Sequence, residues 1–287
     1  MKRFDNLSFS VIILLLIADV FAWYWVAAGG ADGRTRIHFL DVGQGDSELV
    51  VLPDGARILI DAGPAGAAAT RAVRSVLPGY SRHIDLGMIT HPQLDHFGGF
   101  LSLLDYYDLG AIVFNGREDG PAAEWTALAA KIKERGIPLI VLGAEDSIRQ
   151  GAAAIDILSP NAEFAGSGEL NDTGLVALLR APALRALFAA DTGFSVENYL
   201  RQKFDLRADV LKISHHGSRY SSAADFLEAV RPKVAVAEVG AGNNYGHPTQ
   251  DAMARIKAIG AAIFRTDQNG TVSIVSDGFK LGVFTGK

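Results

Sequence analysis

The chain has 287 residues, of which 49% are hydrophobic and 21% are charged, a composition that allows a packed core and excludes disorder throughout. The formal net charge of -5 argues against a protein that grips nucleic acid by bulk charge, so any such contact would need a local basic patch. The absence of cysteine excludes disulfides, thiolate metal sites and a cysteine nucleophile.

Two basic residues near the N-terminus precede an almost wholly apolar run over residues 9–28. This run is close to the ~20 residues that a bilayer core requires, and aromatic residues lie near its far end. We expect an uncleaved signal anchor, a single transmembrane helix that crosses the cytoplasmic membrane once and leaves the rest of the chain on the extracytoplasmic side. Residues 1–33 would form this anchor and a short linker. A cleaved signal peptide is the alternative, because residues 27–29 are small.

From residue 34 onward, short β-branched runs alternate with stretches of helical spacing. Strands are predicted at residues 37–40, 48–52, 57–63, 84–90, 138–143, 153–159, 174–181, 183–191, 209–214, 234–239, 262–266, 271–278 and 280–284. Helices are predicted at residues 67–77, 121–136, 195–204, 222–231 and 249–260. The strands come in adjacent groups separated by helices, which favours an α/β fold of two mixed sheets with helices outside over a single parallel sheet. No linker rich in Pro, Ser or Gly interrupts residues 34–287, which are expected to form one domain.

The strongest chemical signal is the segment THPQLDHFGG at residues 90–99, directly after a predicted buried strand. His91, Asp95 and His96 place two imidazoles and a carboxylate within six residues on a strand-to-helix loop, where they can converge on one cation. Histidine nitrogen and aspartate oxygen suit zinc, manganese or iron. The alternative is a helix cap made by Asp95, with the histidines incidental.

Three further segments place polar side chains at or near the ends of predicted strands. Adjacent histidines follow the strand near residue 214, and neighbours in an extended segment point in opposite directions, so His215 is preferred as a ligand over His216. Asp191 closes an apolar run and is either a cap or a ligand. His247 lies in a loop rich in glycine and asparagine. Taken singly, turn, cap and surface roles are the default interpretation of these segments.

Polar residues in the early turns complete the set of candidates: Asp41, Gln44, Asp46 and Asp61. They are interpreted as turn formers or as partners that orient the histidines. Five of the seven histidines and several aspartates follow predicted strands, and strand ends are where sites assemble in layered α/β folds. Chance placement is therefore a poor explanation for the clusters taken together.

Eight segments resemble the metallo-β-lactamase superfamily, and within it the extracytoplasmic hydrolase domain of the ComEC competence proteins, which serve DNA uptake. The segments are FLDVGQGDS, LIDAG, THPQLDHFGG, NDTGLVALL, LFAADTG, ADVLKISHHGSRYSS, YGHPT and FRTDQNGTV, and they cover essentially residues 36–276. Their order and spacing make the resemblance specific. It implies an αββα sandwich, which agrees with the grouping of predicted strands and helices.

The same resemblance implies a site for one or two divalent ions, zinc or manganese. The implied ligands are His91, Asp95, His96, Asp191 and His215, with Asp191 bridging two ions. Two positions depart from the superfamily pattern, because Gln93 stands where the HxHxDH loop usually has its second histidine and Asn171 where a mid-chain histidine is expected. Both are uncertain ligands at the position that His91 serves. One ion, a second ion held weakly, and a chain without activity are therefore all open.

The function implied by this resemblance is hydrolysis of a phosphodiester by a metal-activated water, with DNA as the expected substrate and the DNA-uptake machinery as the expected partner. The residues expected to act in catalysis are Asp95, Asp191, Lys212, His216 and His247. Those expected to touch substrate phosphates are Ser218, Arg219, Ser221 and His247. Two alternatives stay open, a hydrolase of a lactam, lactone or thioester, and a domain without activity that binds nucleic acid or another partner.

Overall fold

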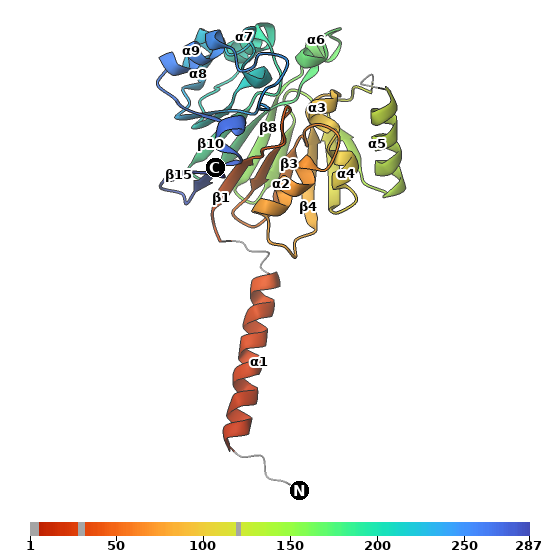
Figure 1. Ribbon diagram of the computed structural model, residues 1–287, viewed down its shortest axis with the longest axis vertical. Helices are drawn as coiled ribbons and strands as arrows, with labels where there is room; N and C mark the ends of the chain where they lie inside the picture. Colours follow the sequence, from red (N-terminus) through yellow and green to blue (C-terminus); the bar gives the residue numbers. More distant parts are fainter. Residues whose placement is uncertain (1–5, 28–31, 119–121) are drawn as a thin grey trace.

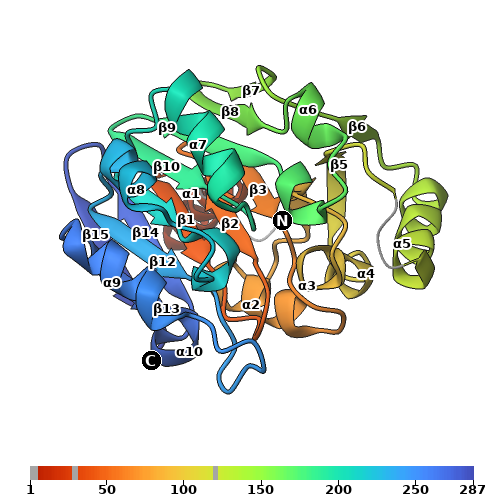
Figure 2. The same ribbon diagram turned by 90° about the horizontal axis from the view of Figure 1, so that it is seen from above.

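Two β-sheets pack face to face, and helices cover the outer side of each (Figure 1). The computed structural model describes residues 6–27, 32–118 and 122–287. Figure 2 looks down on the sandwich from the end opposite the N-terminal helix α1 (Asn6–Ala27). The predicted αββα arrangement is confirmed as two sheets flanked by helices.

The first sheet has eight strands. In chain order they are β1 (Thr35–Phe39), β2 (Glu48–Val51), β3 (Arg57–Ile60), β4 (His83–Ile89), β5 (Asp108–Phe114), β6 (Leu139–Val141), β14 (Val272–Ser276) and β15 (Leu281–Thr285). Their order across the sheet is β15-β14-β1-β2-β3-β4-β5-β6. Strands β3 to β6 run parallel, so the carboxyl ends of β3 and β4 lie at one edge of the sheet.

The second sheet has seven strands. In chain order they are β7 (Ser147–Gln150), β8 (Ala153–Ser159), β9 (Val176–Ala181), β10 (Leu184–Phe188), β11 (Val210–Lys212), β12 (Val234–Ala237) and β13 (Ala262–Arg265). Their order across the sheet is β13-β12-β11-β10-β9-β8-β7. Strands β10 to β13 run parallel, so their carboxyl ends also share one edge.

Alternation along the strands decides which side chains fill the space between the sheets. On β3, Ile58 and Ile60 join the core cluster between the sheets, whereas Leu59 joins the cluster on the outer face. This is the period of two that a strand imposes on its side chains. Across the inner core, the rings of Phe39 and Phe188 lie with centroids 6.3 Å apart. Apolar contacts between the two layers therefore hold the sandwich together.

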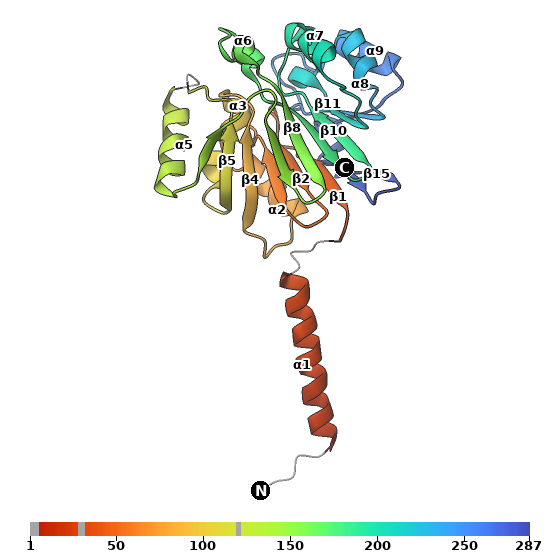
Figure 3. The ribbon, with the colours of Figure 1, turned by 180° about the vertical axis from the view of Figure 1, so that it is seen from behind.

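Two groups of helices cover the outer faces, as Figures 1 and 3 show from opposite sides. The helices are α2 (Ala68–Val76), α3 (Leu94–Phe97), α4 (Phe100–Leu103), α5 (Ala122–Glu134), α6 (Ala162–Ala165), α7 (Phe194–Lys203), α8 (Ala224–Val230), α9 (Gln250–Ala258) and α10 (Thr266–Asn269). Two short 3-10 helices are η1 (Leu170–Thr173) and η2 (Ser214–Gly217). Helices α2, α4 and α5 pack on the first sheet through Val73, Phe100 and Trp125. Helices α7 and α8 pack on the second sheet through residues such as Leu200 and Leu227.

The strand β7 and the turn η2 differ from the sequence-based expectation. Strand β7 was not predicted, because its sequence SIRQ has one apolar residue and its side chains are mostly exposed at the edge of the sheet. The strand predicted to end at residue 214 ends at Lys212, and η2 follows. His215 and His216 in η2 have positive φ values of 48° and 52°, so they are not part of an extended segment.

Helix α1 stands apart from the sandwich, and the described side chains of residues 8–24 are exposed (Figure 1). Among the residues that the structure describes, no helix combines the length and the apolar character needed to cross a bilayer. The prediction of a transmembrane helix over residues 9–28 is therefore not supported. The linker predicted to follow lies partly outside the described residues, which leave out 28–31.

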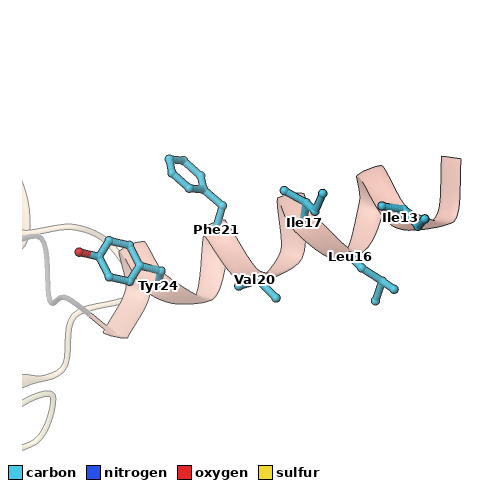
Figure 4. Close-up of a pocket in the computed structure, with 6 residues that line it drawn as sticks. All are labelled: Ile13, Leu16, Ile17, Val20, Phe21 and Tyr24. Atoms are coloured by element: carbon cyan, nitrogen blue, oxygen red, sulfur yellow. The ribbon is translucent and has the colours of Figure 1, made fainter. Parts of the chain in front are cut away.

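A shallow apolar groove on α1 is formed by side chains of that helix alone (Figure 4). The lining residues are Ile13, Leu16, Ile17, Val20, Phe21 and Tyr24. Helix α1 lies at the opposite end of the sandwich from α3, the helix that carries two of the polar residues described below (Figure 1). The groove therefore takes no part in that site.

Candidate metal centre

Several parallel strands end at one edge of the sandwich, and a polar residue follows each of them closely. Asp61 follows β3, His91 follows β4, Asp191 follows β10 and His216 follows β11. All four side chains are buried, as is His96 on α3. The two sheets thus bring together residues that are more than a hundred positions apart in the chain, as expected for a site at strand ends.

Three buried histidines share one hydrogen-bonding pattern. The Nδ1 atom of His91 lies 2.9 Å from the hydroxyl of Thr90, and Nδ1 of His216 lies 2.8 Å from the backbone carbonyl of Glu238. The Nδ1 atom of His96 lies 2.7 Å from a carboxylate oxygen of Asp61. The Nε2 atoms of all three rings are buried without a hydrogen-bond partner among the described residues. Histidine ligands of metals typically bond through one ring nitrogen and have the other oriented in this way.

The separations between candidate ligand atoms fit a small divalent ion. Nε2 of His96 lies 3.4 Å from Oδ2 of Asp191, and Nε2 of His216 lies 3.3 Å from the same oxygen. Nε2 of His216 also lies 3.5 Å from Oδ2 of Asp95. Two ligands about 2.1 Å from a tetrahedral ion lie about 3.4 Å from each other, which matches these distances. The two carboxylates and two imidazoles therefore form a suitable ligand set, called the ion position below.

The electrostatics of the ion position also favour a cation. Burial opposes protonation of His96, but the Asp191 and Asp61 carboxylates raise the pKa of its ring well above the ordinary value. The pKa of His216 is raised in the same way, against burial, by Asp191 and Asp46. Protons on the imidazoles thus balance the carboxylates when no metal is bound. A divalent ion would take over that balance, since the same atoms are ligands once deprotonated.

His91 and Asp95 are poised in the protonation states that metal ligands need. Burial, together with the nearby charge of His96, lowers the pKa of His91 to about 3, so its ring is neutral at pH 7. Burial alone would raise the pKa of Asp95, but its contact with His216 lowers that pKa to about 2. Both side chains therefore offer a lone pair rather than a proton.

Residues 40–239 match the family described as the metallo-beta-lactamase superfamily. The chain belongs to this superfamily. Its fold and its clusters of histidine and aspartate support binding of a divalent metal. The metallo-β-lactamase fold protein YhfI from Bacillus subtilis superposes with a TM-score of 0.57 at 10% identity, over 85% of this chain and 100% of that one. CmlA, a diiron β-hydroxylase from Streptomyces venezuelae, gives 0.54 at 14% identity, over 80% and 52%.

Curated relatives of this superfamily domain include proteins named for competence. The chain is 28% identical over 255 residues to ComE operon protein 3 of Bacillus subtilis, which covers 83% of this chain and 32% of that protein. It is 31% identical over 253 residues to competence protein ComA of Neisseria gonorrhoeae, covering 84% and 32%. The chain therefore spans about a third of the length of these relatives. The resemblance to ComEC-type proteins found in the sequence is confirmed.

Of the two adjacent histidines in this superfamily site, His216 and not the expected His215 faces the carboxylates. His216 is buried and faces the carboxylates of Asp95 and Asp191, whereas the side chain of His215 is 30% exposed. Nε2 of His215 lies 3.9 Å from Asp191, and its ring lies closer to the surface, with its centroid 5.5 Å from that of His247. The expectation assumed extended backbone, but both residues are left-handed. The geometry therefore favours His216, not His215, as the ligand.

The position of Lys212 differs from the one that its expected role in catalysis requires. Its side chain is fully buried, and its ammonium donates to the Ala190 carbonyl at 2.9 Å. It forms an ion pair with Asp46 and lies 3.4 Å from Oδ1 of Asp191. Lys212 thus lies on the interior side of the carboxylates of the superfamily site. There it can neutralise and orient Asp46 and Asp191, but it cannot reach a substrate.

The residues predicted to touch substrate phosphates divide into two groups. Ser218 and Ser221 are buried; the Ser221 hydroxyl donates to the carbonyl of Ser214 in η2 at 2.8 Å, and the Ser218 hydroxyl accepts the N–H of Tyr220 at 3.3 Å. Arg219 is exposed, and its guanidinium lies 5.9 Å from the centroid of the Tyr220 ring. The structure therefore leaves Arg219 available for substrate and not the two serines.

The two uncertain ligands contact each other. Gln93 Nε2 donates to Oδ1 of Asn171 at 2.6 Å, and Nδ2 of Asn171 lies 3.4 Å from Nδ1 of His215. His91, at the same side of the site, keeps its Nε2 free of hydrogen bonds within the described residues. The amides of Gln93 and Asn171 therefore bond to one another where the superfamily pattern would have two histidines.

Sequence reasoning missed a buried carboxyl pair behind the site, Glu48 and Glu238. Both are buried, and burial together with the charge of Asp46 raises the pKa of Glu238 to about 8. Glu238 accepts the backbone N–H of Ser47 at 3.0 Å. A glutamate within the apolar run VAVAEV was a signal that could have identified Glu238 as a residue with a special partner. Asp46 and Asp61, in contrast, lie where partners of histidines were expected.

Proposed function

We propose that this domain is a metal-dependent phosphodiesterase that cleaves nucleic acid, and that it acts in DNA uptake. The observation that carries the proposal is the chemistry of the side of the ion position where the side chains are partly exposed, called the open side below. His215 and His247 border it with ring centroids 5.5 Å apart, and Arg219, which is exposed, follows η2 closely in the chain. Nitrogen donors and a guanidinium suit the anionic oxygens of a phosphodiester. The names of the competence relatives support DNA as the substrate.

The ion position would hold zinc or manganese through Asp95, His96, Asp191 and His216. A divalent ion bound there supplies Lewis acidity and lowers the pKa of a water molecule. The side chain of Asp95 is 31% exposed, so it can accept a proton from water at the open side while Oδ2 faces His216. Asp61 fixes the orientation of His96 through their 2.7 Å contact.

The half-buried rings of His215 and His247 would position the substrate. His247 lies against Tyr245, whose ring is stacked at a centroid distance of 6.0 Å and an interplanar angle of 25°. Nδ1 of His247 is buried and has no hydrogen-bond partner among the described residues. His215 and His247 would donate to phosphoryl oxygens on which negative charge grows during the reaction. The predicted extracytoplasmic location of the domain stays a prediction.

The test is hydrolysis of bis-p-nitrophenyl phosphate and of a labelled oligonucleotide by the purified chain with Zn²⁺ or Mn²⁺. We expect cleavage of both, and a loss of at least about 100-fold in Asp191→Asn, which keeps the shape but removes the charge of a ligand. Nitrocefin serves as the matched substrate for the lactam alternative. Turnover of nitrocefin without turnover of either phosphodiester would reject the proposal. Binding of the oligonucleotide without cleavage of any substrate would point to a domain that only binds.

A further inference from the structure

We propose that the centre binds a single divalent ion, and that the hydrogen-bonded amides of Gln93 and Asn171 close the position where the superfamily pattern provides for a second. The inference rests on the metal dependence in the proposed function, but it does not depend on which substrate is cleaved. The ion position described above fits one ion. The second position is the one beside it, formed by His91, Gln93 and Asn171. Three observations argue that this second position does not bind an ion.

The first observation is the amide pair itself. Gln93 Nε2 donates to Asn171 Oδ1 at 2.6 Å, so the one carbonyl oxygen of Asn171 is engaged. The amide nitrogen of Asn171, in η1, lies 3.4 Å from Nδ1 of His215, so the His215 ring lies against η1. The Asn171 backbone is also fixed, because its carbonyl accepts the N–H of Gly174 at 3.2 Å. Neutral amides joined in this way offer a second ion far less than two imidazoles would.

The second observation concerns the carboxylate that would have to bridge two ions. Oδ2 of Asp191 faces the Nε2 atoms of His96 and His216 at 3.4 and 3.3 Å. Oδ1 faces the ammonium of Lys212 at 3.4 Å. Because Lys212 is fully buried, its charge cannot turn out into solvent to release that oxygen. Asp191 therefore has one oxygen for metal and one for lysine.

The third observation is the balance of charge. Asp95 and Asp191 carry two negative charges, which match one divalent ion. The further buried carboxylate, Asp46, is already paired with the ammonium of Lys212, and the residues at the second position, His91, Gln93 and Asn171, bring no carboxylate to offset a second ion. Uncompensated charge in a buried site is strongly unfavourable.

His91 has a role in a centre with a single ion. Its Nε2 atom is buried without a partner among the described residues. Candidate ligand atoms of His91, His96 and Asp191 all lie within 4.8 Å of one another. His91 can therefore reach the same ion as His96 and Asp191, or a water bound between them, without a second metal.

The decisive experiment counts ions on the full chain. The protein is equilibrated with excess Mn²⁺ or Zn²⁺, free metal is removed, and metal per chain is measured by plasma mass spectrometry. We expect one ion per chain, and for Mn²⁺ the electron paramagnetic resonance spectrum of an isolated ion without exchange coupling. The double variant Gln93→His with Asn171→His should bind a second ion and give a coupled spectrum. The matched control, Gln93→Ala with Asn171→Ala, opens the amide pair without adding ligands and should stay at one.

Each result decides the inference. Two ions or none on the unaltered chain, or a coupled Mn²⁺ spectrum, overturns it. One ion on the double-histidine variant, with circular dichroism unchanged, overturns the role given to the amide pair. If that variant fails to fold, the count and the spectrum of the unaltered chain still decide. One ion without phosphodiester cleavage would reject the proposed function and leave this inference standing, whereas two ions with cleavage would do the reverse.

Discussion

Oδ2 of Asp61 lies 2.7 Å from Nδ1 of His96, and the same carboxylate accepts the backbone N–H and the hydroxyl of Thr90 at 2.8 and 2.6 Å. One buried carboxylate thus ties the end of β3 to the loop after β4 and sets the direction of a candidate ligand. Asp61 itself has a positive φ of 51°, which shows that the backbone turns sharply to bring it there. The geometry of the ion position depends on residues that would not touch the metal.

Asp61→Asn should weaken metal binding by about 10- to 100-fold, because an amide that replaces the carboxylate no longer orients His96 as strongly. The affinity can be measured by competition with a chromophoric chelator. Asp41→Asn is the matched control, since Asp41 lies at a half-buried turn and pairs with Lys287. Equal affinities in Asp61→Asn and Asp41→Asn would show that the contact with His96 does not matter.

His216→Ala and His215→Ala should separate the two adjacent histidines. We expect His216→Ala to lose the metal, because it removes a buried ring that faces Asp95 and Asp191. His215→Ala should keep the metal and lose activity, because its ring is half-buried and lies nearer the surface than that of His216. Metal content and phosphodiester hydrolysis are measured on both variants. The reverse pattern would restore the original preference for His215.

Lys212→Met should destabilise the metal-free protein by about 3–5 kcal/mol, because it leaves Asp46 and Asp191 buried without their cation. Urea unfolding followed by circular dichroism measures the change. Lys233→Met is the matched control, since the side chain of Lys233 is 74% exposed and its pair with Asp209 should contribute at most about 1 kcal/mol. Similar losses in both variants would contradict the structural role of Lys212.

Glu197 should make stability fall as the pH rises. Burial raises the pKa of Glu197 from 4.5 to about 7, even though its carboxylate accepts the backbone N–H groups of Ser222 and Ala223. A raised pKa means that the folded state holds the proton more tightly than the unfolded state. Its contribution to stability is therefore fully present below pH 4.5 and is lost as the pH rises towards 7, by at most about 3 kcal/mol.

The measurement for Glu197 is the free energy of unfolding between pH 4.5 and 8, in the unaltered chain and in Glu197→Gln. The variant cannot ionise, so its slope should be flatter across this window, whatever its overall stability. Only the difference between the two slopes reports on Glu197, because other buried carboxyls such as Glu238 titrate in both proteins. Parallel curves would mean that Glu197 keeps an ordinary pKa.

Much of the fold and of the ion position could be predicted because the signals were local. Strand periodicity and strand-end residues indicated the two sheets, and they brought His91, Asp95, His96 and Asp191 together. His91 and Asp191 lie shortly after strands, and Asp95 and His96 lie on the short helix α3 that follows β4, so the direction of the chain limits where these side chains can go.

What could not be predicted depended on backbone angles or on distant partners. The preference for His215 rested on an extended backbone, and the left-handed residues of η2 contradict that premise, which alternation cannot reveal. Lys212 lies on β11 and Glu238 directly after β12, yet their partners are Asp46, in the loop before β2, and Glu48, on β2 of the other sheet. A sequence read along one chain does not show which charges will meet across the interior.

Neither layer of the sandwich contains all the ligands of the ion position. His91 and His96 come from the segment after β4 in one sheet, with His96 on α3, and Asp191 and His216 follow β10 and β11 in the other. A fragment that contains either layer alone would have only half of the ligands of the ion position and would lack the complete metal site. Strand β1 pairs with β14, which lies near the end of the chain, so the first sheet is complete only when that part of the chain is present. The appearance of a tight metal site during synthesis or refolding would therefore mark the moment when the two layers have docked.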